Sequence, residues 1–246
     1  MKLASLLLMA LAAPQSAFAF VAKNTWIFSG NPPGGLRDVT FAFKMDGAPH
    51  KSGYYFAQQF NFQGISRVAY CGIQSRPNGT GGKSIVHAVF STFQGNSTTQ
   101  DSKCHMGADG LRAGVSCAVE FPGSYDAVYN IVVEHVQGTT WKGTAINNST
   151  GESFHIGSWT LPSAAGGIKS NQRGFVEYYP WNSRRHGHEC RDLPRTAVTM
   201  FDPYSKTPGA GTGRINKPYE SGDCLGKVAF STQKVANGYG VQCGFE

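Results

Sequence analysis

The sequence predicts an all-β protein: a two-sheet antiparallel β-sandwich or jelly roll, stapled by disulfides, with a loop-rich C-terminal third. β-Branched residues dominate, because beyond residue 19 the chain holds sixteen Val and sixteen Thr but only five Leu. Such side chains suit a pleated sheet better than a helix. From Tyr54 onward the pattern has period two, which places Phe56, Phe60 and Phe62 on one face and Tyr55 on the other.

A series of segments with this strand character runs along the chain, separated by turn signals. A turn at 31–35 precedes the first strand, 76–79 separates the third from the fourth, 121–123 ends the fifth, and 205–209 follows the tenth. Proline presets φ and glycine supplies positive φ in such turns. The expected strands are, in order, residues 39–45, 54–62, 67–74, 85–93, 114–121, 129–136, 141–147, 154–161, 174–181, 197–201, 227–232 and 239–245.

Residues 187–220 differ from the rest of the chain, because glycine, proline and charged residues are dense there. The segment is either a long loop system over one end of the sandwich or a short strand pair within one. Loops on a rigid sheet are common places for binding sites. No internal repeat and no linker divides the chain, so we expect one β-sandwich domain at 20–246. It follows an expected signal peptide at 1–19.

The N-terminus has the form of a secretory signal peptide. Lys2 provides a basic start, residues 3–13 are apolar but too short to span a bilayer, and residues 17–19 read Ala-Phe-Ala, a small-x-small cleavage pattern. We expect cleavage after Ala19 and release of a secreted, extracellular protein with no membrane span. Glycosylation sequons in polar loop segments favour a eukaryotic source and lie at Asn78, Asn96 and Asn148.

All six cysteines lie beyond the signal peptide, and an even number in a secreted chain predicts three disulfides. No Cys-x-x-Cys occurs, so the spacing argues against a zinc site. The six allow fifteen pairings. We expect a local clamp, a staple across the C-terminal loops and one long-range bond, joining Cys104 to Cys117, Cys190 to Cys224 and Cys71 to Cys243.

Several short motifs look catalytic but have the wrong spacing or context. Residues 79–84 lack the first glycine of a phosphate-binding loop, and residues 209–213 lack the third glycine of a dinucleotide fingerprint. Ser116 lies in an alternating strand rather than at a strand-to-helix turn, which disfavours a serine hydrolase. Residues 186–189 read His-Gly-His-Glu, but flanking arginines favour an exposed basic loop over a metal site. We therefore expect no metal and no cofactor.

Polysaccharide chemistry on a β-sandwich needs either a carboxylate pair for hydrolysis or a neutral base with a charge-stabilising group for lyase elimination. Among the carboxylates on expected strands, Glu177 stands out over Glu120 and Glu134 because aromatic residues flank it. Residues 234–242 are similar to the terminal strand of jelly-roll alginate lyases, whose lysine, tyrosine and glutamine line an acidic-sugar cleft. The accompanying Gln-x-His motif is missing. The candidate catalytic set for an enzyme is Glu177, Lys234, Tyr239 and Gln242.

Aromatic side chains offer flat platforms on which sugar rings stack. Strand alternation sends Tyr178 and Tyr179 to opposite faces, so at most one of them belongs to such a platform. The formal net charge of +7 favours acidic polymers or anionic microbial surfaces, and no nucleic-acid-binding motif is present. The expected glycan-binding residues are Trp141, Tyr179, Trp181, Arg184 and Arg185.

Three strand motifs follow one another along the chain: Tyr-x-Gly-Ile-Gln at 70–74, Phe-Ser at 90–91 and Gly-Val-x-Cys at 114–117. In this order they resemble a family of secreted domains of unknown function, and the similarity extends over residues 54–181. The resemblance implies a β-sandwich that contacts glycans outside the cell, and it assigns no catalytic residue. The matching residues are Tyr70, Gly72, Gln74, Phe90, Ser91, Gly114, Val115, Cys117 and Glu177.

We expect a secreted, monomeric protein that binds polysaccharide or cell-wall glycan, with an effector role at a host or microbial surface. The absence of a complete catalytic motif favours binding without catalysis. The alternative is a polysaccharide lyase or glycoside hydrolase of jelly-roll type, which requires Glu177 and the 234–242 strand to converge on one groove. A third hypothesis, membrane-active antimicrobial action, rests only on basic charge. The sequence leaves open whether the chain is an enzyme.

Overall fold

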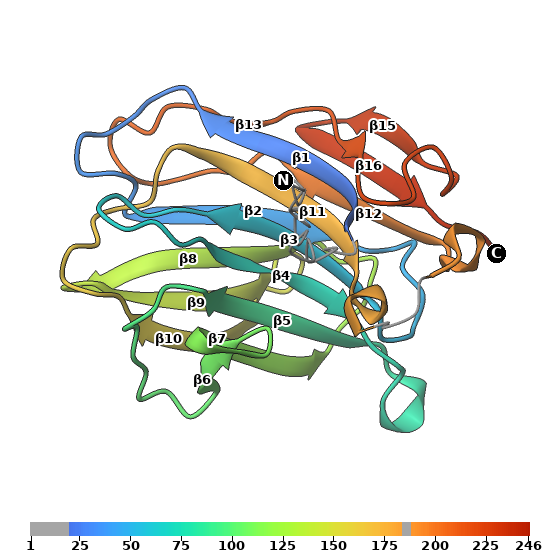
Figure 1. Cartoon of the computed structure of the whole chain (residues 1–246), viewed down its shortest axis with the longest axis horizontal. Coiled ribbons are helices and arrows are strands. Elements are labelled where there is room, and N and C mark those ends of the chain that lie inside the picture. Colours follow the sequence, from blue (N-terminus) through green and yellow to red (C-terminus); the bar gives the residue numbers. More distant parts are fainter. Residues whose placement is uncertain (1–19, 184–187) are drawn as a thin grey trace, which may run out of the picture.

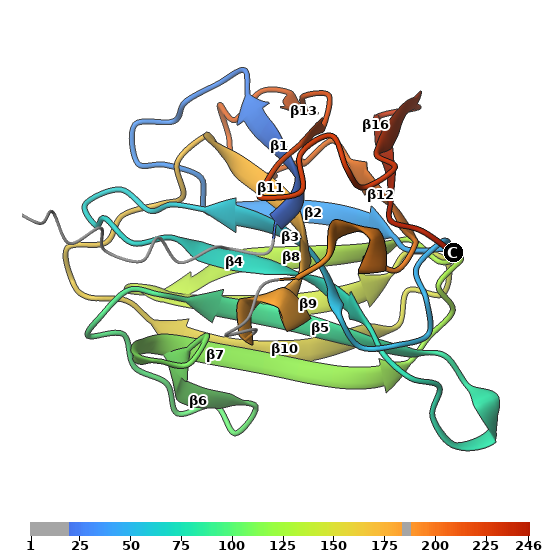
Figure 2. The same ribbon diagram turned by 45° about the vertical axis from the view of Figure 1, so that its right-hand side comes forward.

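The computed structural model describes residues 20–183 and 188–246, which form two antiparallel sheets packed face to face (Figure 1 and Figure 2). The predicted all-β sandwich is confirmed. The nine-stranded sheet holds, in spatial order, β13 (Gly213–Ile215), β1 (Phe20–Phe28), β11 (Asn171–Tyr178), β3 (Tyr54–Phe60), β4 (Ala69–Ser75), β5 (Ile85–Thr92), β7 (Leu111–Pro122) and β6 (Cys104–Ala108), while β14 (Tyr219–Glu220) also pairs with β1.

The seven-stranded sheet packs against it. Its strands are, in spatial order, β10 (Ser153–Thr160), β9 (Thr140–Asn147), β8 (Tyr129–Gln137), β2 (Asp38–Lys44), β12 (Thr196–Phe201), β16 (Gly238–Cys243) and β15 (Ser231–Val235). Short 3-10 helices lie in the connections: η1 (Thr80–Gly82), η2 (Tyr179–Ser183) and η3 (Cys190–Asp192). None of the helices in the described ranges is long and apolar enough to cross a membrane.

Aromatic side chains fill the core between the two sheets. Phe62 packs against Trp141 with ring centroids 4.8 Å apart, and Phe90 stacks on Trp159 at 4.4 Å. Burying a phenylalanine in this way contributes about 1.5–3 kcal/mol. Trp141 is only 1% exposed, so the prediction that it binds glycan is wrong. Alternation along β9 turns Trp141 inward together with Gly143 and Ala145.

β1 was missed by the sequence prediction, as were β6, β13 and β14. One inward-facing residue of β1 is Asn24, which is completely buried and donates from Nδ2 to Gln58 Oε1 at 3.2 Å. A buried amide pair interrupts the apolar alternation that identifies a strand in sequence. The strand expected at 227–232 instead spans Ser231–Val235, because backbone hydrogen bonds form turns before it, including one from Lys227 to Cys224.

Two of the three predicted disulfides are present, Cys104–Cys117 and Cys190–Cys224. The third is wrong, because Cys71 and Cys243 are free and buried. Cys71 lies on β4 of one sheet and Cys243 on β16 of the other. Packed sheets stand about 10 Å apart, whereas a disulfide needs Cα atoms within about 7 Å.

The three sequons lie on the surface, since Asn78, Asn96 and Asn148 are all exposed. Glycosylation at these positions stays a prediction. The proposed signal peptide, residues 1–19, lies outside the described residues. The two disulfides are consistent with folding in an oxidising, extracellular environment.

Candidate functional site

The candidate site lies on the outer face of the nine-stranded sheet, the face that points away from the core. The strand registers place one residue from each of five neighbouring strands in a line across this face: Glu177, Tyr55, Gln74, His87 and Glu120. We call this line the outer row. Neighbouring strands lie about 4.8 Å apart, so the outer row spans about 19 Å.

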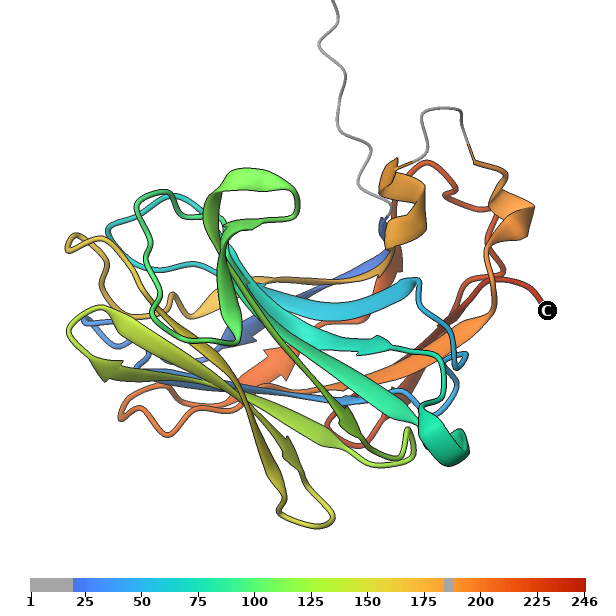
Figure 3. The same cartoon turned by 90° about the horizontal axis from the view of Figure 1, so that it is seen from below.

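Two structural elements stand on the same side of this sheet. In Figure 3 the green β6–β7 hairpin and the orange η2 segment both rise from it. The outer face also carries an apolar cluster that the sheet separates from the main core. Its buried members are Tyr55, Ala57, Tyr70, Val89 and Phe175, and Phe20, Phe93, Ala118 and Tyr179 pack around them partly buried.

Glu177 is the buried carboxyl of this face, with only 8% of its surface exposed. Burial raises its pKa, a hydrogen bond from Asn182 Nδ2 to Oε1 (2.7 Å) opposes that shift, and the charge of Asp109 raises it further. Tyr55, its cross-strand neighbour, has a buried hydroxyl with no hydrogen-bond partner among the described residues. Glu177 therefore holds its proton to a higher pH than an ordinary glutamate, next to an unpaired hydroxyl.

A second carboxyl reaches the outer face from the turn of the β6–β7 hairpin. Asp109 sits at the exposed tip with a positive φ of 47°, and its Oδ1 accepts a hydrogen bond from Tyr70 OH at 2.9 Å. Burial of the carboxyl raises the pKa of Asp109, while the bond from Tyr70 lowers it. The disulfide between Cys104 and Cys117 ties the two strands of this hairpin together.

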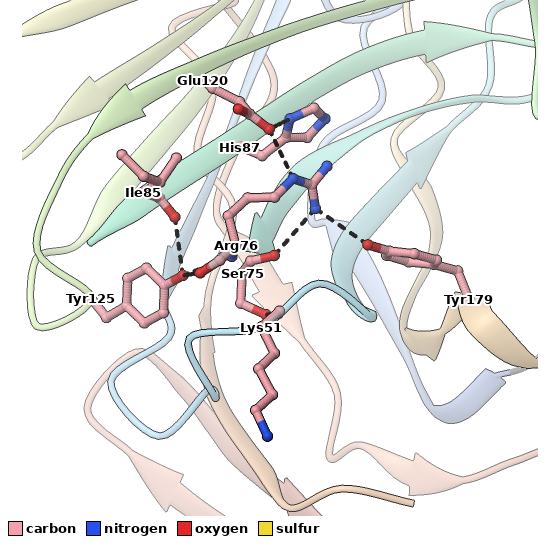
Figure 4. Close-up of polar contacts among 8 residues, drawn as sticks. All are labelled: Lys51, Ser75, Arg76, Ile85, His87, Glu120, Tyr125 and Tyr179. Atoms are coloured by element: carbon pink, nitrogen blue, oxygen red, sulfur yellow. Dashed lines mark hydrogen bonds and ion pairs between the residues drawn. The ribbon is translucent and has the colours of Figure 1, made fainter. Parts of the chain in front are cut away.

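Arg76 contacts Glu120, the residue at the β7 end of the outer row (Figure 4). Its Nε donates to Glu120 Oε1 at 2.8 Å, and its Nη1 donates to Tyr179 OH at 3.3 Å and to the Ser75 carbonyl at 3.2 Å. This one guanidinium therefore connects β7 to η2. Beside it lies an open depression of about 570 Å³, whose lining includes Arg76 and Glu120.

His87 shares the same acceptor, since its Nδ1 lies 2.9 Å from Glu120 Oε1. Its pKa is lowered to about 4 by burial and by the Arg76 charge, and the contact with Glu120 offsets this only in part. His87 is consequently neutral near pH 7, where Nδ1 carries the hydrogen donated to the Glu120 carboxylate. The neutral ring leaves Arg76 as the cation that pairs with Glu120.

The predicted lyase set does not come together. Glu177 lies on the outer face of the nine-stranded sheet, whereas Lys234, Tyr239 and Gln242 belong to β15 and β16 of the other sheet. There the Lys234 ammonium sits 4.2 Å over the Tyr239 ring, and Gln242 accepts a hydrogen bond from Arg195. The expectation of one groove formed by all four residues is wrong.

The predicted glycan platform is not assembled either. Trp181 is 6% exposed and stacks on His188 with ring centroids 3.9 Å apart, so it offers no free face. Tyr179 is half-buried and lies at the outer face, while Arg184 and Arg185 lie outside the described residues. Within the ranges 20–183 and 188–246, no group of three His, Cys, Asp or Glu side chains is arranged to hold a metal.

Sequence reasoning selected Glu177 but missed the rest of the outer face. Tyr55 and His87 come from segments distant in sequence, and the strand register places them in the outer row, while Asp109 reaches the same face through the hydrogen bond from Tyr70. One signal was available: the alternation from Tyr54 onward already placed Tyr55 on the face opposite the core phenylalanines. Gln74 appeared among the residues of the family resemblance without a role.

No protein-family model matches the chain, and no curated protein does. Among solved structures, scytalido-glutamic peptidase with a peptide-based transition-state analogue aligns over 93% of this chain and 100% of its own, at 11% identity and a TM-score of 0.49. SCP-B, of the eqolisin family of peptidases, in a complex with the tripeptide Ala-Ile-His, covers the same shares at 12% identity and 0.45.

A CBM2 module of the evolved Dit protein of Lactobacillus casei BL23 phage J-1 aligns over 63% of this chain and 68% of its own. Its identity is 13% and its TM-score is 0.27. At these identities and TM-scores the solved structures assign no activity to this chain.

Proposed function

We propose that this chain is a secreted polysaccharide hydrolase that binds an extended glycan across the outer face and uses Glu177 as the general acid. The observation that carries the proposal is the buried Glu177 carboxyl among aromatic rings outside the main core. Enclosing a carboxyl in this way costs stability, and strongly perturbed carboxyls cluster at functional sites.

Two of the carboxyls on the outer face, Glu177 and Asp109, suit a division of labour. Glycoside hydrolysis needs one carboxylic acid that protonates the leaving oxygen and one carboxylate that activates water or attacks the sugar. Burial raises the pKa of both carboxyls, but Glu177 is the more enclosed of the two and the Asp109 charge raises its pKa further, whereas Asp109 sits at an exposed hairpin tip where the hydrogen bond from Tyr70 offsets part of the shift. Glu177 would therefore give its proton to the glycosidic oxygen while Asp109 takes one from water.

The shape of the face fits a polymer rather than a small molecule. The outer row is about 19 Å long, and the depression beside Arg76 and Glu120 continues it at one end. The partly buried rings of Phe20, Phe93 and Tyr179 border the face and present aromatic surface to sugar rings. Glycan binding at this face is thus part of the proposal, in place of the platform expected from Trp141 and Trp181.

A second candidate is peptide-bond hydrolysis at the same face. The observation that favours it is the pairing of the acid with amides: Asn182 donates directly to Glu177, and Gln74 lies in the outer row beyond Tyr55. Peptide hydrolysis passes through an oxyanion that such amide donors stabilise. In its ionised form the same carboxyl can take a proton from water as the water attacks an amide carbonyl, and can then give that proton to the leaving amine.

The test is a substrate panel followed between pH 3 and pH 8 with the protein beginning at Phe20. Neutral and acidic polysaccharides and an unfolded protein are incubated, and reducing ends, new amino groups and depletion of the protein are measured together. New reducing ends support the glycan proposal, whereas new amino groups alone support the peptide candidate. Depletion with no product on any substrate overturns hydrolysis and leaves a glycan-binding protein of the effector type.

Glu177→Gln is the decisive variant, because glutamine has nearly the same shape as glutamate but no acidic proton to donate. Loss of general acid–base catalysis lowers the rate by about 10²–10⁴-fold. Glu134→Gln is the matched control: Glu134 is a partly exposed glutamate on β8 of the other sheet, paired with Lys142 at 2.8 Å. Equal product formation by Glu177→Gln and wild type would remove Glu177 from the chemistry.

A further inference from the structure

Two cationic side chains, Lys23 on β1 and Arg173 on β11, lie on the outer face beyond the outer row. Counting away from Glu177 on β11, the next outward residues are Phe175 and Arg173; on β1, Lys23 lies opposite Phe175 and Thr25 opposite Arg173. Four residues of strand place Arg173 about 13 Å from Glu177, with Lys23 between them in that direction. Both cations thus lie on the same face as the proposed acid.

The Lys23 ammonium packs against an aromatic ring. It lies 4.7 Å from the centre of the Phe20 ring, and Phe20 packs on Phe175 with centroids 4.8 Å apart. Burial lowers the pKa of Lys23, and the Arg173 charge lowers it further. The two like charges therefore act on each other across neighbouring strands.

Within the ion pairs formed by the described residues, neither Lys23 nor Arg173 has an acidic partner. Like charges at diagonal positions of neighbouring strands repel each other when the side chains are long, and partial burial of the Lys23 ammonium adds to that cost. A bound anion neutralises the repulsion between the two cations, which gives a reason for placing them side by side.

We propose that Lys23 and Arg173 form an anionic subsite that binds the carboxylate groups of an acidic polysaccharide, such as a polyuronate, lying across the outer face. The inference rests on the proposed function, since it names the substrate class of the same face. The partly exposed Phe20 ring lies beside Lys23, so a uronate ring can pack against it while the sugar's carboxylate meets the Lys23 ammonium.

A polyuronate fits the surface formed by Phe20, Lys23 and Arg173 better than an acidic peptide does. A sugar acid joins a flat apolar ring face directly to a carboxylate, which matches an aromatic surface bordered by a cation. Arg173, two residues further along the same face, can take the carboxylate of a later sugar through its bidentate guanidinium. Acidic peptide binding is retained as an outcome of the experiment.

The experiment measures binding alone, in the Glu177→Gln background, so that turnover does not interfere. The probes are an oligogalacturonate and its fully methyl-esterified form, which share one sugar backbone and differ in that a neutral methyl ester replaces each carboxylate. The variants are Lys23→Gln/Arg173→Gln and the control Lys227→Gln, which removes an exposed lysine beyond η3. Circular dichroism checks folding, and Arg173→Gln alone is the fallback because that residue is exposed.

We expect the acidic probe to bind at least about tenfold more tightly than the ester at low salt, and less so as salt rises. The preference disappears in the double variant and persists in Lys227→Gln. Equal binding of both probes, or an unchanged preference in the double variant, overturns the inference. Equal binding of polyglutamate assigns the pair to acidic peptides and also overturns it.

This binding result is separable from the proposed function. Tight, charge-dependent binding without any product would sustain the subsite and refute hydrolysis. Product formation with no preference for the acidic probe would sustain hydrolysis and refute the subsite.

Discussion

His87 makes the stability of this protein depend on pH in a defined direction. Its pKa is lowered from 6.5 to about 4, mainly by burial and then by the Arg76 charge. The unfolded chain binds a proton near pH 6.5, whereas the folded chain resists it until about pH 4. The unfolded state therefore binds more protons in this window. The stabilisation is present above pH 6.5 and is lost as the pH falls towards 4.

The magnitude follows from the shift. About 2.5 pKa units correspond to about 3 kcal/mol in the free energy of unfolding, at roughly 1.4 kcal/mol per unit. The His87 side chain is only 17% exposed, so solvent screens the effect little. For a chain of this size, 3 kcal/mol lowers the melting temperature by roughly 6–12 °C.

Urea unfolding at about pH 7.5 and about pH 4 tests this for wild type and His87→Gln, a variant that keeps a polar side chain at this position but does not titrate. Other groups also titrate over this range, so the relevant quantity is the difference between the two proteins. We expect wild type to lose about 3 kcal/mol more than His87→Gln on acidification. His105→Gln is the control, because His105 is exposed on β6, and it should behave as wild type does. Equal losses in wild type and His87→Gln would refute the account of His87.

Three further predictions concern the disulfides, the thiols and the N-terminus. Replacing Cys104 and Cys117 together by serine opens a bond between residues 13 apart, which should lower the free energy of unfolding by about 3 kcal/mol in a denaturant titration; an unchanged midpoint would contradict this. The two free thiols are buried, so we expect a thiol reagent to modify neither in the native protein and both after unfolding. Rapid native labelling would place them at the surface instead. If the chain is cleaved after Ala19, the new ammonium group of Phe20 lies opposite Glu177 and lowers its pKa, so a protein with a short N-terminal extension should keep its hydrolytic activity to higher pH. Superimposable pH profiles for the two forms would exclude this coupling.

Most strands were predictable because their alternation is local. The segment from Tyr54 is an example, since its phenylalanines face the core as expected. β1 was not predictable in the same way, because Asn24 occupies a core position and finds its partner Gln58 on another strand. The third disulfide failed for a related reason. Nothing in the spacing of Cys71 and Cys243 says that they lie on opposite sheets.

Of the candidate site, the sequence indicated Glu177 but not its surroundings. Aromatic neighbours in sequence marked Glu177, which the structure shows to be buried, and its catalytic role stays a prediction. Its partners depend on the pairing of β11 with β3 and on the fold of the β6–β7 hairpin, which carries Asp109. Trp141 shows the opposite error: a residue chosen for its chemistry has its side chain turned into the core by the register of β9.

The most direct test of the central claim is the pH–rate profile of hydrolysis for wild type and Glu177→Gln on whichever polysaccharide the panel identifies. The account predicts that wild-type activity falls as the pH rises through the pKa of Glu177, at a value above the usual 4.5. It also predicts that Glu177→Gln is folded, still binds the glycan and loses activity at every pH. A Glu177→Gln protein with the rate and the profile of wild type would contradict the account.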